Sequence, residues 1–112
     1  GEKRERFHVR LGNRIWQHAK QEPPQGDKNK TQNWVLLAVD HFNKGSGQIV
    51  EEDKRAMLAM LNLYAARVAV SRAALEMAVA YVRKGVALLD PKIRWKSHYE
   101  LTLNLYSTLA EL

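Results

Sequence analysis

Apolar residues recur along residues 2–20 at the spacing of one face of a helix. The apolar face consists of residues four positions apart together with their neighbours: Phe7, Leu11, Ile15, His8, Gly12 and Ala19. The opposite face carries four basic side chains, called the basic stripe below: Lys3, Arg6, Arg10 and Arg14. Residues 2–20 are therefore predicted to form an amphipathic helix.

The polar segment QEPPQGDKNK at residues 21–30 contains two prolines and a glycine. These residues interrupt helices, so an exposed loop is predicted there. The segment TQNWVLLAVDHFNKG has the apolar spacing of a second helix over residues 31–44, with Thr31 as its N-cap and Gly45 as its stop. A strand over WVLLAV is the alternative interpretation, because a short apolar run is compatible with either element.

Residues 51–84 contain neither glycine nor proline, and the sequence EEDKR at their start suits the first turn of a helix. One helix of this length would extend about 50 Å, which is long for a small domain. A break is predicted near AVSRAA, where Ser71 can cap a following helix, so that residues 53–70 and 73–89 form an antiparallel pair. The sequence DPK ends this pair, and a fifth helix is predicted over residues 94–112.

The composition agrees with an all-α fold. The chain has 112 residues, close to the size of one domain, and its hydrophobic residues (46%) are mainly aliphatic, since aromatics make up only 8%. We therefore expect one domain over residues 2–112, built from about five helices arranged as antiparallel hairpins. Gly1 is expected to be the remnant of a removed tag.

Two successive helix pairs suggest a tetratricopeptide-like repeat, in which about 34 residues form one pair with large and small residues at fixed positions. The matching positions are Leu11, Gly12, Ala38 and Phe42 in the first pair, Ala65, Ala66, Ala78, Val82, Gly85 and Pro91 in the second, and Trp95, Tyr99 and Leu103 in a third. Small residues let two helices approach closely, and large ones fill the neighbouring groove. The third unit would lack its second helix, which suggests a fragment of a larger protein.

The phrases LNLYAARVAVSRAALEMAVAYVRKGVALL and RWKSHYELTLNLYSTLAEL give a more specific indication. They resemble the tetratricopeptide-like region of large signalling proteins that join a serine/threonine kinase, an AAA-type (STAND-like) ATPase and a sensor histidine kinase. FHVRLGNRIW and VDHFNKGSGQIV fit other phrases of that region, so the resemblance covers nearly the whole chain. It departs at Ala66, at Arg72 and in the long proline loop.

The resemblance implies a non-catalytic scaffold or protein-interaction segment of a signal-transduction ATPase or kinase. Partners would then be the flanking domains of the parent protein or another protein. The predicted interaction residues lie in the last helix and just before it: Trp95, Tyr99, Leu101, Leu105 and Leu112. Self-association through the same face, giving a homo-oligomer, is an alternative.

The net charge of +6 raises nucleic-acid binding by the basic stripe as a second alternative. Glu2 and Glu5 flank the stripe, and no aromatic residue interleaves with it for base stacking. A solvated face, or one that docks on an acidic domain, is therefore favoured over nucleic acid.

No catalytic, cofactor or metal site is expected. The chain has no cysteine, its histidines lack the spacing of a helical metal pair, and Ser46 lies in a GSG turn rather than in the nucleophile turn of a hydrolase. His41 is expected to pack beside Phe42, and His98 to donate a hydrogen bond at the start of the last helix. A charged N-terminus and the absence of a long apolar run favour a cytoplasmic protein without a membrane segment.

Overall fold

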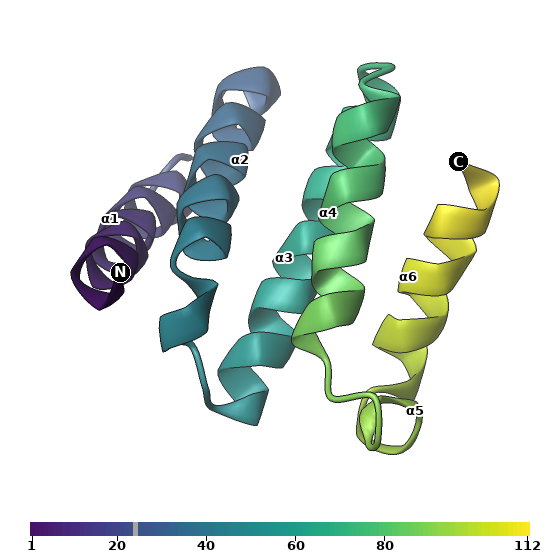
Figure 1. The fold of residues 1–112 in the computed structure, drawn as a ribbon. Helices are drawn as coiled ribbons and strands as arrows, with labels where there is room; N and C mark the ends of the chain where they lie inside the picture. The colour runs from purple at the N-terminus through teal and green to yellow at the C-terminus, as the bar shows by residue number, and fades with distance from the viewer. Residues whose placement is uncertain (24) are drawn as a thin grey trace. The chain divides into compact units, whose positions relative to one another are not determined.

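The computed structural model describes residues 1–23 and 25–112, and every regular element in them is helical (Figure 1). The elements are α1 (Glu2–Lys20), α2 (Lys28–Lys44), the short 3-10 helix η1 (Ser46–Gln48), α3 (Glu52–Ser71), α4 (Leu75–Leu88), α5 (Arg94–Ser97) and α6 (Tyr99–Glu111). Five of the six α-helices have seven or more residues, which confirms the predicted all-α fold. The chain divides into two compact units, Gly1–Val50 and Glu51–Leu112.

The first unit is a hairpin of α1 and α2. The helices approach closely where Gly12 faces Phe42, since a Cβ atom added to Gly12 would lie 2.9 Å from Cδ1 of the Phe42 ring. The remaining core of this unit comes from the facing sides of the two helices: Ile15, Ala19, Val35, Ala38 and Val39. Phe7, predicted on the apolar face, is instead 52% exposed, so the buried face begins one turn later along α1.

The loop between these helices is shorter than predicted. Helix α2 begins at Lys28, and Asp27 rather than Thr31 is its N-cap, because the Asp27 carboxylate accepts a hydrogen bond from the backbone N–H of Asn29 at 2.9 Å. The Thr31 hydroxyl donates to the carbonyl of Asp27 instead. Pro24 lies outside the described residues. The strand alternative over WVLLAV is wrong, since that run lies inside α2.

Helix α2 ends at Gly45, as predicted, and the chain passes very close to α1 there. A Cβ atom at Gly45 would lie 2.7 Å from Cγ2 of Val9 and still closer to the Glu5 carbonyl oxygen. Position 45 therefore requires glycine for reasons of space, because the obstacle includes backbone.

The second unit consists of α3 and α4, with α6 packed against both (Figure 1). Helix α3 is buried on several sides, and alanines at Ala59, Ala65 and Ala66 are fully covered. Gly85 of α4 faces α6, where an added Cβ atom would lie 2.8 Å from Cδ2 of Leu105. Small residues thus let the three helices approach one another closely.

The turn between α3 and α4 is a Schellman motif. The N–H of Ala74 bonds the carbonyl of Ala69 at 2.8 Å, and the N–H of Ala73 bonds that of Val70 at 2.9 Å. Ala73 has a φ of 58°, in the left-handed region that usually takes glycine. The break near AVSRAA is confirmed, but Ser71 is no cap for α4, because its hydroxyl donates back to the carbonyl of Val68.

The last segment is two helices rather than one. The chain bends at His98, which has φ −132° and ψ 46°, between α5 and α6. The His98 carbonyl accepts a hydrogen bond from the buried Thr102 hydroxyl at 2.7 Å. The predicted hydrogen bond of His98 is present: its Nε2 lies 3.0 Å from the Glu52 carboxylate, which accepts, and this contact ties the start of α6 to α3.

Candidate interaction surface

Three aromatic side chains gather where α5 meets α6, and they are called the aromatic cluster below. The Trp95 ring stacks on Tyr106 with centroids 5.7 Å apart and an interplanar angle of 13°. Tyr99 completes the cluster, with its ring centroid 5.9 Å from that of Trp95. Trp95 lies in α5, before the bend at His98, and this bend brings its ring beside that of Tyr106 in α6.

The aromatic cluster lies at the protein surface. Trp95 is 45% exposed and Tyr99 is 56% exposed. Leu103, 43% exposed, lies between Tyr99 and Tyr106 at i, i+4, i+7 spacing, so these three residues form one line along α6, called the α6 stripe. The buried side of the same helix holds Thr102 and Leu105. Helix α6 thus has an inner face that packs on its unit and an outer face that is largely aromatic.

The five interaction residues predicted from the sequence lie in different environments. Trp95 and Tyr99 are exposed members of the aromatic cluster, and Leu112 is exposed at the end of the chain. Leu101 is half-buried, whereas Leu105 is fully buried against Gly85 and serves the packing of α6 on α4. Leu105 is therefore unavailable to a partner.

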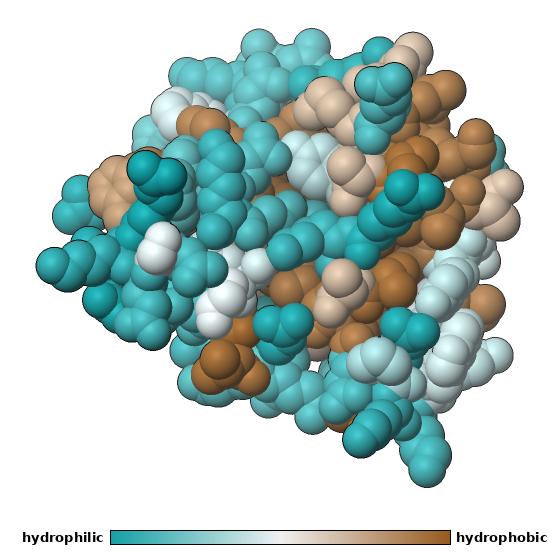
Figure 2. Space-filling model, viewed as in Figure 1, coloured by the Kyte–Doolittle hydropathy of each residue, from teal (hydrophilic) through white to brown (hydrophobic). Residues whose placement is uncertain are grey.

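Leu103 and Tyr106 were not predicted as interaction residues. The spacing of Tyr99, Leu103 and Tyr106 carries the signal in the sequence, because it places all three on one helix face. Figure 2 shows hydrophobic side chains gathered over α4 and α6 in this view of the second unit.

A positive charge lies beside Tyr106 of the α6 stripe. The Arg94 guanidinium carbon is 5.5 Å from the centroid of the Tyr106 ring, within the range of a cation–π interaction. Arg94 Nε is buried and has no hydrogen-bond partner among the described residues. Lys92 and Lys96 are exposed on either side of it in the sequence. The acidic residues nearby in the sequence are Asp90, whose carboxylate accepts from the backbone N–H of Lys92, and Glu100.

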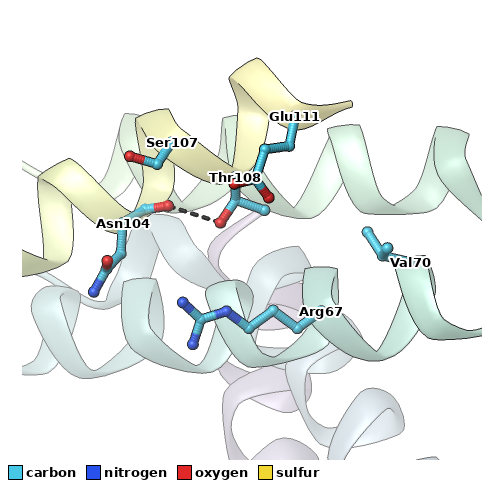
Figure 3. A pocket seen from close by; sticks show the side chains of 6 residues that line it. All are labelled: Arg67, Val70, Asn104, Ser107, Thr108 and Glu111. Carbon is cyan, nitrogen blue, oxygen red and sulfur yellow. Dashed lines mark hydrogen bonds between the residues drawn. The ribbon is translucent and has the colours of Figure 1, made fainter.

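A polar groove separates α6 from the C-terminal half of α3 (Figure 3). Its volume is about 250 Å³, and its lining consists of Arg67, Val70, Asn104, Ser107, Thr108 and Glu111. The Thr108 hydroxyl is engaged with the Asn104 carbonyl at 2.7 Å, and Figure 3 shows the Arg67 side chain extending toward Asn104. The groove offers hydrogen-bonding groups, whereas the α6 stripe on the other side of the same helix offers apolar area.

The predicted basic stripe is exposed along α1, with Lys3, Arg6, Arg10 and Arg14 all at the surface. Arg6 Nη1 lies 3.5 Å from the Glu2 carboxylate, so part of its charge is compensated within the helix. An exposed pair of this kind stabilises a helix only slightly.

The histidines of the first unit form ring contacts. The His41 ring stacks on His8, with centroids 5.1 Å apart. Burial lowers the pKa of His41, and the charges of His8 and Lys44 lower it further, while Asp40 acts in the opposite direction. His18 contacts the edge of Trp34 with centroids 4.6 Å apart. Among the described residues, no three His, Cys, Asp or Glu side chains come together as a metal site.

No protein-family model matches the chain, and neither a curated protein nor a solved structure gives a significant match. In the part of the chain that the structure describes, no helix is both long and apolar enough to cross a membrane.

Proposed function

We propose that this chain is a non-catalytic, tetratricopeptide-like helical segment that binds a protein partner through the outer face of α5 and α6. The exposed aromatic cluster is the observation that carries the proposal. Tryptophan, tyrosine and arginine are the residues most enriched at the energetic centres of protein interfaces, and here all three types lie within contact distance of one another.

The available area indicates what kind of binding to expect. A fully covered Trp or Tyr side chain buries about 150–250 Å², so the exposed parts of the aromatic cluster amount to roughly 300 Å². At about 25 cal/mol per Å² this area contributes about 7 kcal/mol, while association costs about 4–15 kcal/mol. The aromatic cluster alone would bind weakly, and Leu103 and the neighbouring charges must add to it.

The wider setting rests on the resemblance in sequence. We propose that the segment belongs to a cytoplasmic, multidomain signal-transduction ATPase or kinase, where it acts as a scaffold between a nucleotide-binding module and signalling domains. The partner would be one of those flanking domains or another protein.

A selection from a library of helical peptides displayed on phage tests the proposal. Peptides enriched on the wild-type chain should bind at least about tenfold more weakly to a Trp95→Ala/Tyr106→Ala variant and to Leu103→Glu. Leu103 is exposed and is not one of the three aromatic residues, so its substitution tests the surface beside the cluster. A Met57→Ala/Met60→Ala variant, which alters exposed side chains on α3, is the matched control and should bind normally. Peptides that bind all variants equally, or no enrichment, would contradict the proposal.

Nucleic-acid binding by the basic stripe is the second candidate, and the exposure of its four cationic side chains on α1 supports it. Neutralising four phosphates would give a slope of about −3.6 in a plot of log affinity against log salt. Arg6→Glu plus Arg10→Glu should abolish such binding to a duplex. Salt-independent or absent binding would exclude this candidate.

A further inference from the structure

We propose that the partner of the α6 stripe is an amphipathic helix whose acidic end lies against α5. This inference rests on the proposed function and deepens it, because it names the secondary structure and the charge of the partner. Both follow from the shape of the stripe and from the charges near it.

The geometry of the α6 stripe favours a helical partner. Tyr99, Leu103 and Tyr106 span about 10 Å along the helix axis, at 1.5 Å per residue. The backbone groups of α6 are engaged within the helix, and no strand edge exists among the described residues, so an extended peptide could not add itself by main-chain hydrogen bonds. Recognition must come from side chains, and a row at i, i+4, i+7 fits between the side-chain rows of another helix.

The charges on and beside α5 favour an acidic partner. Lys92 and Lys96 are exposed and have no ion-pair partner among the described residues. Arg94 is fixed against Tyr106 at the edge of the aromatic cluster. The Asp90 carboxylate accepts a hydrogen bond from the backbone N–H of Lys92. Glu100 lies in the first turn of α6, where an acidic side chain interacts favourably with the helix dipole. Carboxylates on a partner would therefore meet unpaired cations beside the aromatic surface.

The last turn of α6 carries a negative charge instead. Glu111 lies in the last turn, and the exposed residues between it and the α6 stripe are uncharged. A second copy of this chain is disfavoured, because two copies with a net charge of +6 each repel one another. A different protein with an acidic helix end satisfies both the apolar and the charged parts of the surface.

The sequences of the peptides selected on the wild-type chain test this inference. They should carry apolar residues at i, i+3 or i+4, and i+7, with Asp or Glu concentrated at one end. A Lys92→Glu/Lys96→Glu variant should bind them about tenfold more weakly, and it should prefer synthetic peptides in which lysine replaces those acids. Lys3→Glu/Arg10→Glu is the matched control, because it lowers the net charge equally on the first unit and should leave binding unchanged. All four positions are exposed, and circular dichroism checks that each variant is folded.

The outcomes separate the two proposals. Peptides that need Trp95 and Tyr106 but show no acidic end, or bind the charge-reversed variant normally, would overturn the inference and leave the proposed function standing. Peptides indifferent to the aromatic cluster would overturn both. Dimerisation in sedimentation that Leu103→Glu abolishes would identify a second copy as the occupant, and the inference would then be wrong.

Discussion

The Nδ1 atoms of His8 and His41 lie 2.9 Å apart and join α1 to α2 in the first unit. The two rings are also stacked, with an interplanar angle of 22°. A hydrogen bond between two Nδ1 atoms requires one of them to donate and the other to accept. The contact therefore exists while at least one ring is neutral, and it becomes repulsive when both rings are protonated.

Acidification should weaken the first unit. The folded structure lowers the pKa of His41 from its ordinary value of 6.5, so the unfolded chain binds more protons than the folded one as the pH falls through that value. Stability is fully present above pH 6.5 and is lost toward the folded-state pKa. An NMR titration of the His41 ring should place its midpoint below 6.5, and His41→Gln should reduce the loss of thermal stability between about pH 7.5 and pH 5. A midpoint at or above 6.5 would contradict this account.

Gly45→Ala should destabilise the first unit by about 1–3 kcal/mol, because the new methyl group meets the Glu5 carbonyl and Val9. Denaturant unfolding followed by the fluorescence of Trp16 and Trp34 measures the change. Gly47→Ala is the control: its methyl group would meet only the end of the flexible Glu5 side chain, at 2.5 Å. Equal losses for the two variants would show that the close approach of the backbone is unimportant.

Asp27→Ala should cost about 1 kcal/mol through loss of the N-cap of α2. Thr31→Ala should cost less, since the Thr31 hydroxyl donates to a carbonyl and caps no free N–H group. The free energy of unfolding of both variants distinguishes the two residues. A larger loss of unfolding free energy for Thr31→Ala would indicate that Thr31 is the N-cap, as predicted from the sequence.

Thr102→Val should destabilise the second unit by about 1 kcal/mol, because the buried hydroxyl bonds the His98 carbonyl at the bend before α6. Thr108→Val removes a hydrogen bond of the same type and length from an exposed position of the same helix. Water can replace the exposed bond, so that variant should be nearly neutral or slightly stabilised. Comparable losses would mean that burial does not decide the effect.

Most of the fold follows from local signals in the sequence. Pro91 prevents a helix for reasons of backbone chemistry, which act wherever proline stands, whereas Gly45 has a φ of −101° and is required by the close approach of α1. The N-cap was missed because Asp27 and Thr31 are both suitable residues, and only the structure decides which side chain reaches a free N–H group. The exposure of Phe7 depends on what covers it, which spacing along one helix does not reveal.

The candidate site was predicted only in part, and the bend at His98 explains why. In one continuous helix, Trp95 and Tyr106 would be separated by about 16 Å along the axis, too far for their rings to touch. The bend removes this separation and lets the two rings stack with their centroids 5.7 Å apart. Trp95 and Tyr99 could be predicted as interaction residues from their residue types and sequence neighbours. The contribution of Tyr106 depends on a tertiary contact.

The alanine at position 73 makes the second unit less stable than it could be. A left-handed backbone costs an alanine roughly 1–2 kcal/mol, a penalty that glycine avoids. Ala73→Gly should therefore raise the melting temperature of the second unit. The greater freedom of glycine in the unfolded chain offsets part of this gain. One substitution in a turn could thus offset a destabilising change elsewhere in the unit, which gives its outer surfaces more freedom to vary.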